Sequence, residues 1–265
     1  MTDKSQLLAD LKLVREKSPL VHNITNYVVM NNSANALLAI GASPIMAHAV
    51  EEIEDMVSIV SVLVINMGTL SEKWVDAMLF AGNAAHKRGI PVVFDPVGVG
   101  ATPYRNRVAA SILSACKPSI IRGNGSEIMA LAKESVSTKG VDSTTSSNNA
   151  LDAAKRLALE TGAVVVISGE EDFITDGITV RSVKNGSTLM TKVTGMGCTA
   201  TAVVGAFAAI NSNMLDAATH GMAVMGVAGE MASQKSQGPG TLQLHFYDAL
   251  YNLTPEILAD KILLG

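Results

Sequence analysis

The sequence predicts an α/β fold of three layers, in which a mostly parallel central sheet carries helices on both faces. Short, almost wholly apolar runs alternate with helix-length segments through most of the chain, and this alternation is typical of repeated strand–helix–strand units. Strands that are apolar throughout indicate a parallel sheet buried on both sides. Glycines follow several of the helical segments, at Gly41, Gly89 and Gly162, where a left-handed residue commonly ends a helix.

The individual elements follow from the same pattern, and the whole chain, residues 1–265, is expected to form one domain. The strands of the parallel part are expected at residues 43–47, 62–66, 91–95, 119–122 and 164–168. The helices between them are expected at residues 27–40, 51–60, 71–88, 105–116 and 150–161. The one Ser/Thr/Asn-rich stretch, residues 135–149, predicts a loop.

The pattern changes after residue 168. Residues 172–175, 178–184 and 187–193 predict short strands, joined by turns at Asp176-Gly177 and Asn185-Gly186. These strands indicate an antiparallel edge of the sheet. Residues 198–210 and 215–233 are rich in Ala, Gly and Val, which predicts two closely packed, buried helices.

Composition excludes several classes of protein. The chain is 48% hydrophobic, with 20 basic against 24 acidic residues and no basic cluster longer than a pair, so we expect no nucleic-acid partner. No apolar run is long enough to cross a bilayer, and the polar start lacks the features of a signal peptide. The two cysteines, Cys116 and Cys198, suggest neither a disulfide scaffold nor a metal site. A cytoplasmic protein without a membrane partner is therefore expected.

The strongest local signal lies at residues 193–198, where a predicted strand leads through Gly195 and Gly197 into a helix. Glycines at such a junction let backbone amides approach an anion, and the helix dipole adds positive charge. The same glycines could simply make a tight turn. Cys198 lies in the first helical turn, where its pKa could be below the reference of about 8.5. It could then act as a nucleophile or a base, or it could be an inert buried residue. For Cys116 only the inert role is expected.

Two more polar groups follow predicted strands. Asp95 ends one strand and precedes a glycine-rich loop, and ligands of open α/β sheets bind at that edge. Asn124 and Glu127 follow Arg122 at the next strand end, and together they could present oxygen atoms to a hydrated magnesium ion. Each of these groups could instead cap a turn or a helix, as could Asn26, which precedes the helix at 27–40.

Seven sequence blocks occur in order along the chain. They are P-L-V-H-N-I-T-N, G-A-S-P-I-M-A-H, N-M-G-T-L, F-D-P-V-G-V-G-A-T, I-R-G-N-G-S-E-I, T-K-V-T-G-M-G-C and G-P-G-T. Together these blocks resemble the ribokinase-like kinases, and more closely the hydroxyethylthiazole kinase family, over nearly the whole chain. We also assign Asn23, in the first block, to substrate binding.

The resemblance implies a ribokinase-like fold, ATP as phosphoryl donor, Mg²⁺ as cofactor and 5-(2-hydroxyethyl)-4-methylthiazole as the small-molecule alcohol that is phosphorylated in thiamine biosynthesis and salvage. It places Met46 and Gly195 at substrate-contact positions, and Arg122 and Ser168 at nucleotide-contact positions. Cys198 stands where most ribokinase-like enzymes carry a catalytic Asp, and this family is similar in having Cys there. The resemblance also implies a homotrimer with active sites at the subunit interfaces.

The mechanism expected from these residues is phosphoryl transfer to the alcohol. The acceptor hydroxyl would lie near Cys198, the amides of residues 195–198 would hold the γ-phosphoryl group, and Asp95, Asn124 and Glu127 would position hydrated Mg²⁺, with Asn124 also near the nucleotide. A loose transition state requires positioning and charge neutralisation more than a strong base.

Three alternatives remain at this level. They are a kinase for another vitamin-precursor alcohol, a nucleotide-dependent dehydratase of the same superfamily, and a nucleotide-binding module without turnover. The chain departs from the family pattern in having Met196 where Ala is usual and Ser168 where Thr is usual.

Overall fold

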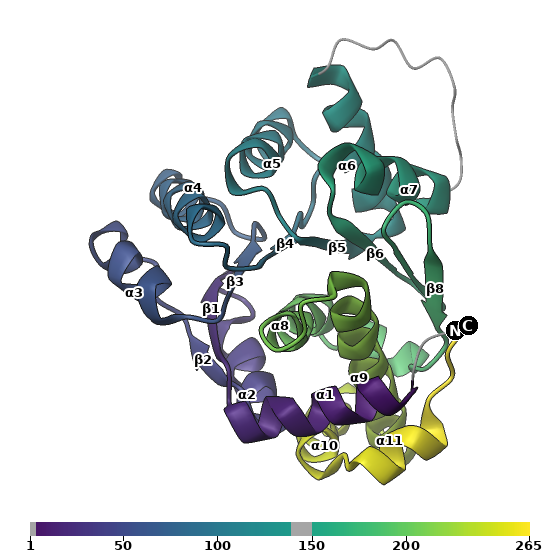
Figure 1. Cartoon of the computed structure of the whole chain (residues 1–265). Helices are drawn as coiled ribbons and strands as arrows, with labels where there is room; N and C mark the ends of the chain where they lie inside the picture. The colour runs from purple at the N-terminus through teal and green to yellow at the C-terminus, as the bar shows by residue number, and fades with distance from the viewer. Residues whose placement is uncertain (1–3, 139–149) are drawn as a thin grey trace.

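The computed structural model describes residues 4–138 and 150–265, and its eight strands form a single sheet with helices on both faces (Figure 1). The strand order is β2-β1-β3-β4-β5-β6-β7-β8. The first six strands are parallel, whereas β7 is antiparallel to both of its neighbours. The strands are β1 (Leu20–Ile24), β2 (Ser43–Ile45), β3 (Val62–Asn66), β4 (Val92–Asp95), β5 (Ile120–Asn124), β6 (Val164–Ser168), β7 (Asp172–Thr175) and β8 (Val180–Val183).

The helices form the two outer layers. In chain order they are α1 (Lys4–Lys17), α2 (Met30–Ile40), α3 (Ile53–Ile59), α4 (Glu72–Lys87), α5 (Pro103–Cys116), α6 (Gly125–Thr138), α7 (Ala150–Thr161), α8 (Met196–Ala208), α9 (Met214–Lys235), α10 (Pro239–Asn252) and α11 (Pro255–Lys261), with short 3₁₀ helices η1 (Val50–Glu52) and η2 (Thr188–Lys192). None of those in the described part of the chain is both long and apolar enough to cross a membrane.

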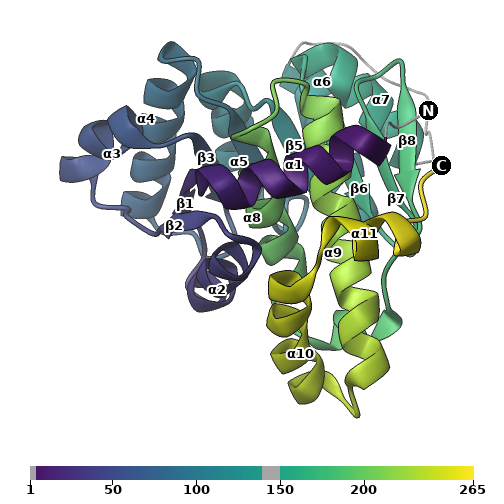
Figure 2. The ribbon, with the colours of Figure 1, turned by 60° about the horizontal axis from the view of Figure 1, so that its bottom comes forward.

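Each face of the sheet has its own apolar core because side chains alternate along a strand. On β3, Val62 and Val64 pack beneath α1, α2 and α8–α11, whereas Leu63 and Ile65 pack beneath α3–α7. Figures 1 and 2 show these two helical layers, with α1 lying across α8 and α9. The three-layer α/β prediction is therefore confirmed.

The expected strands at 62–66, 164–168 and 172–175 match β3, β6 and β7 residue for residue. The antiparallel edge is also confirmed, and Gly41, Gly89 and Gly162 have the positive φ angles expected after helix ends. The chain also forms β1, α1, α10 and α11, to which the sequence pattern assigned no element.

Two local predictions were wrong. Within the expected strand at 187–193, Thr188–Lys192 form the 3₁₀ helix η2. The outer edge of β8 pairs instead with the end of the chain, since Ser182 and Gly265 exchange two backbone hydrogen bonds of 3.0 Å. Residues 135–138 belong to α6 rather than to a loop. The rest of that expected loop, residues 139–149, lies outside the described residues.

The buried helix α8 brings its N-terminus to the site described below. It packs against β1, β3 and β4, and a Cβ at Gly205 would lie only 2.7 Å from Val64 Cγ2. A Cβ at Gly221, on α9, would lie 2.7 Å from the Val204 Cα. The small residues of α8 and α9 are thus required by close packing, as the sequence predicted.

Candidate functional site

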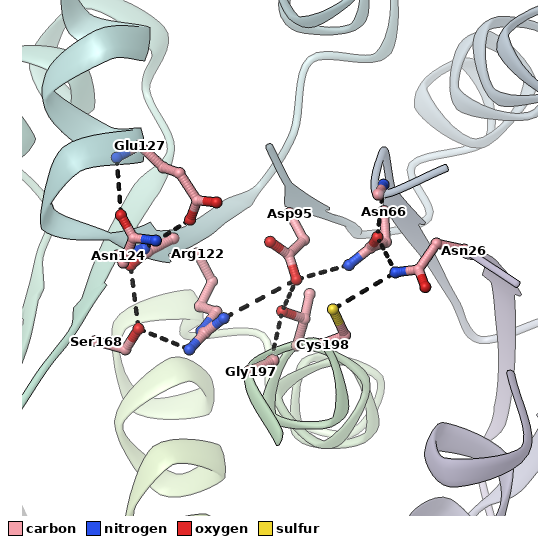
Figure 3. Close-up of polar contacts among 12 residues, drawn as sticks. Asn26, Asn66, Asp95, Arg122, Asn124, Glu127, Ser168, Gly197 and Cys198 are labelled. Atoms are coloured by element: carbon pink, nitrogen blue, oxygen red, sulfur yellow. Dashed lines mark hydrogen bonds and ion pairs between the residues drawn. The ribbon is translucent and has the colours of Figure 1, made fainter. Parts of the chain in front are cut away.

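The candidate site lies where parallel strands end beside the N-terminus of α8. β1, β3, β4, β5 and β6 are neighbours in the sheet, so their carboxyl ends meet at one edge. Polar residues at these ends, or just beyond them, converge there (Figure 3). This is the edge at which open α/β sheets bind ligands.

A chain of buried polar side chains runs across this edge. Asn26 Nδ2 donates to Asn66 Oδ1 at 2.7 Å, and Asn66 Nδ2 donates to Asp95 Oδ2 at 2.8 Å. Thr201, on α8, donates to the same Asp95 oxygen at 2.7 Å. Asn26 Nδ2 also lies 3.5 Å from Cys198 Sγ. The thiol and the carboxylate are therefore linked through two asparagine amides.

Asp95 is only 1% exposed, and this burial raises the pKa of its carboxyl to about 6. The Arg122 guanidinium, whose Nη1 lies 4.0 Å from Asp95 Oδ2, opposes that rise in pKa, as does the hydrogen bond from Thr201, while Glu127 adds to it. A cation bound beside Asp95 and Glu127 would relieve the repulsion between the two carboxylates.

Arg122 connects Asp95 to the end of β6. Its Nη2 donates to Ser168 Oγ at 2.6 Å, and Ser168 in turn donates to the Gly123 carbonyl at 3.3 Å. Arg122 is buried, and its Nε has no hydrogen-bond partner among the residues that the structure describes. The structure thus places the two expected nucleotide-contact residues, Arg122 and Ser168, side by side.

Asn124 and Glu127 form a cap at the start of α6, which is one of the two roles that the sequence allows for them. Asn124 Oδ1 accepts from the Glu127 amide at 2.9 Å, and Glu127 Oε2 accepts from the Asn124 amide at 2.9 Å. Glu127 also reaches out of its own helix, since its Oε1 accepts from the Gly98 amide in the loop after β4 at 2.9 Å. The cap therefore fixes the Glu127 carboxylate beside the loop that follows Asp95.

The glycines before α8 are required for two different reasons. Gly195, the N-cap, has φ of +83°, and a Cβ there would lie 2.5 Å from Val29 Cγ1. Gly197 is helical, but a Cβ there would lie 2.8 Å from Arg122 Nη1. Gly197 thus makes room for the guanidinium. Met196 lies between them and packs partly buried against the core of this face.

The expectation of a lowered pKa for Cys198 is wrong for this arrangement. Burial raises the pKa of its thiol to about 11, and the nearby Asp95 carboxylate adds to the rise, while the amides of Asn66 and Asn26 oppose it. The thiol is therefore protonated at neutral pH. Cys116 is fully buried elsewhere, as expected of an inert cysteine.

A cavity of about 990 Å³ opens beside the α8 N-terminus, within the size range of small-molecule and cofactor sites. It extends from Arg122 and Ser168 to residues of η2 and α9. Its lining also includes Gly195, Met196, Gly197, Asn185, Gly186 and Met225.

Two expected substrate residues lie at the other end of the sheet edge. Met46 follows β2, the edge strand next to β1, and is half-buried. Asn23 is 1% exposed on β1, and its Nδ2 donates to the Val21 carbonyl at 3.0 Å. The structure does not bring Asn23 to the thiol; Asn26, three residues later, takes that place.

Comparisons with known proteins identify the family. The model of the hydroxyethylthiazole kinase family matches residues 11–256. The chain belongs to the hydroxyethylthiazole kinase family. Relatives of that name from Syntrophus aciditrophicus and Leptospira biflexa are each 57% identical over 255 residues, covering 96% of this chain and 94% and 96% of theirs.

Solved structures agree with this membership. The hydroxyethylthiazole kinase from Pyrococcus horikoshii has a TM-score of 0.91 at 39% identity and covers 98% of both chains. The pyridoxal kinase from Staphylococcus aureus, solved with AMP-PCP, has a TM-score of 0.60 at 16% identity, over 80% of this chain and 88% of that one. The second likeness shows that the kinase shares the ribokinase-like fold.

The sequence does not reveal three members of this candidate site. It indicates only a helix cap for Asn26, although the structure begins α2 at Met30, and it indicates no role for Asn66 or Thr201. Asn66 carried a usable signal, because it ends a buried strand as Asp95 does. Thr201 carried none, since its role depends on α8 lying against β4.

Proposed function

We propose that this chain phosphorylates the hydroxyl of 5-(2-hydroxyethyl)-4-methylthiazole, with ATP as the phosphoryl donor. The observation that carries the proposal is the position of the α8 N-terminus. It lies between Arg122, which lines the cavity, and the polar chain that links Asp95 to Cys198 (Figure 3). A phosphoryl group held at a helix N-terminus there would be next to a nucleotide on one side and a hydroxyl on the other.

The nucleotide would occupy the cavity. Arg122 lines the cavity with a guanidinium, and such a group suits the phosphates of a nucleotide. Ser168 holds that guanidinium toward Asp95. The adjoining amides at residues 195–198 would face the γ-phosphoryl group, where the left-handed Gly195 turns the chain into α8.

Asp95 and Glu127 suit hydrated Mg²⁺ better than a metal held only by protein atoms. Among the described residues, no group of three or more His, Cys, Asp or Glu side chains is arranged to hold a metal. Burial raises the pKa of Asp95, and the negative charge of Glu127 adds to that rise. Mg²⁺ in kinases keeps several waters and binds through one or two carboxylates and the phosphates, so these residues would hold it through oxygen ligands and water, with Asn124 nearby.

The transfer itself needs positioning more than proton abstraction. The acceptor oxygen forms the new P–O bond, the bond between the γ-phosphorus and the β–γ bridging oxygen breaks, and ADP leaves with the electron pair. Mg²⁺, when bound, would neutralise charge on the phosphates. A thiol with a pKa of about 11 is a poor base, so Cys198 would orient the hydroxyl together with Asn26. The hydroxyl proton would leave late in a loose transition state, to an oxygen of the transferred phosphoryl group or to water.

We infer further that residues 1–265 act as one kinase domain that assembles as a homotrimer with active sites at the subunit interfaces. One continuous sheet supports the single domain. Tyr27 and Val28, which directly follow Asn26, are 61% and 58% exposed, so apolar surface lies next to the site, as an interface there would require. Sedimentation at assay concentrations should find a trimer; a fully active monomer would contradict the assembly.

A coupled assay of ADP release tests the function. We expect turnover with hydroxyethylthiazole, a low background of ATP hydrolysis without acceptor, and the phosphate ester as product by mass spectrometry. Other vitamin-precursor alcohols in the same panel separate a sister kinase, and loss of water from a substrate would reveal a dehydratase. ADP release that does not depend on any alcohol would contradict the proposal.

A further inference from the structure

One arginine outside the polar chain holds two of the loops that build the site. Arg105 lies in the first turn of α5, whose N-cap is Thr102. Its Nη1 donates to the carbonyls of Met67 at 2.6 Å and Val97 at 2.7 Å, and its Nη2 donates to the carbonyl of Gly68 at 2.8 Å. One side chain thus joins the loop after β3 to the loop after β4.

The geometry uses what is particular to a guanidinium. Two nitrogens of one planar group address three carbonyls, whereas a lysine ammonium is a single point charge on a flexible stem. The loop lies against the planar group: Gly98 has φ of +72°, and a Cβ there would be in van der Waals contact with the Arg105 Nε and Nη1 at 3.4 Å. A side chain at position 98 would be strained by this positive φ.

The main-chain segments that Arg105 holds are those that fix two groups of the site. The Gly68 amide donates to Asn66 Oδ1 at 3.0 Å, beside the carbonyl that Arg105 binds. The Gly98 amide donates to Glu127 Oε1 at 2.9 Å, one residue after the Val97 carbonyl. The same guanidinium therefore restrains both the loop that orients Asn66 and the loop that follows Asp95 and binds Glu127.

We propose that Arg105 is a positioning residue for phosphoryl transfer, acting through the backbone that orients Asn66 and Glu127. Its three hydrogen bonds all go to backbone carbonyls, not to these side chains. Through the backbone, it would hold the carboxylate of Glu127 and the amide of Asn66 in fixed positions relative to Asp95. This inference rests on the proposed kinase function. Its effect is on the geometry of the transition state, so it should appear in kcat more than in the KM for the alcohol.

The test compares Arg105→Lys with Arg107→Lys. Arg107 is an exposed arginine on the same helix, stacked near the Tyr104 ring at 6.0 Å, and its replacement should leave kcat unchanged. Arg105→Lys should lower kcat by about 10-fold to 100-fold, the size of loss that slight misplacement causes. Arg105→Gln serves as a second variant, and each protein is assayed well below its own Tm.

A readout independent of turnover is the exchange of backbone amide hydrogens in the free protein. Peptides spanning residues 96–101 should exchange faster in Arg105→Lys than in wild type, because the Gly98 amide loses its fixed partner Glu127, while Arg107→Lys should match wild type. Combining Arg105→Lys with Glu127→Gln should cost less than the sum of the two single effects on log kcat, since both act on one arrangement.

The proposal is overturned if both Arg105 variants keep the kcat and the exchange rates of Arg107→Lys, or if Tm falls while kcat does not. It is also overturned if the Arg105 and Glu127 effects simply add. If wild type fails to turn over the thiazole alcohol, the proposed function fails instead, and the exchange comparison still decides the role of Arg105.

Discussion

Replacing Gly197 by Ala should impair ATP binding and leave the protein folded. Gly197 lies in the first turn of α8, and an added Cβ would be 2.8 Å from Arg122 Nη1. The guanidinium would have to withdraw by more than half an ångström to reach ordinary contact distance. Arg122 is held on its other side by the 2.6 Å hydrogen bond to Ser168, so the movement would disturb the group expected to meet the nucleotide.

The size of the effect follows from the kind of contact that is lost. A hydrogen bond to a charged group contributes about 1.5–3 kcal/mol, which corresponds to a rise of roughly 10-fold to 100-fold in the KM for ATP. The free energy of unfolding should change little, because the preference for Ala over Gly within a helix, up to about 1 kcal/mol, opposes the cost of moving the Arg122 guanidinium away from Ser168. The Tm should therefore stay close to that of wild type.

Steady-state kinetics with varied ATP, together with thermal unfolding, measures both quantities. Gly205→Ala is the matched control on the same helix, because its Cβ would meet Val64 Cγ2 in the core at 2.7 Å. That variant should lose about 1–3 kcal/mol of stability by overpacking and keep its KM for ATP. An unchanged KM for ATP in a folded Gly197→Ala protein would refute the assignment of Arg122 to the nucleotide.

Three further predictions concern other groups. Cys198→Ala should lower kcat by about 10-fold to 100-fold, the size of loss that misplacement of the acceptor hydroxyl causes, while Cys198→Asp should stay folded and active because a carboxylate can also accept a hydrogen bond from Asn26. An unchanged kcat in Cys198→Ala would exclude a direct role of position 198 beside Asn26. Glu127→Gln should raise the Mg²⁺ concentration needed for half-maximal rate, and an unchanged Mg²⁺ titration would remove Glu127 from the metal site. His220 Nδ1 lies 2.7 Å from Asp10 Oδ2, and burial lowers the pKa of His220 below its usual 6.5. The unfolded state therefore takes up this proton first, and the free energy of unfolding should fall as the pH drops below about 6.5. His220→Gln should make the Tm fall less steeply with decreasing pH, and equal slopes of Tm against pH in variant and wild type would contradict this.

Much of the site could be located from the sequence because its members follow strands that are recognisable locally. Asp95, Arg122 and Ser168 each lie at or near the end of a short apolar run, and parallel strands in one sheet bring such ends together. Gly195 was recognisable for the same reason, since a left-handed residue before a helix needs no knowledge of distant contacts. The residues expected to bind ATP were therefore found near one another.

The rest depended on which elements lie side by side. The amide of Asn26 reaches Cys198 across 172 positions of sequence, and Thr201 reaches Asp95 only because α8 packs against β4. The raised pKa of Cys198 comes from burial and from Asp95, which outweigh the local preference expected at a helix start. Arg105 binds one loop that lies close to it in the sequence, at Val97, and another that lies 38 residues away, at Met67.

The sequence by itself determined the α/β class, the parallel strands, the antiparallel edge and the polar groups at the strand ends. These features depend on the alternation of apolar segments and on the positions of glycines, which influence the backbone over only a few residues. Only the tertiary structure decided that residues 187–193 are not a strand. The end of the chain fills the edge of β8 instead, through Gly265 and Ser182. A strand needs a partner for its backbone groups, and no local pattern tells which distant segment will supply it.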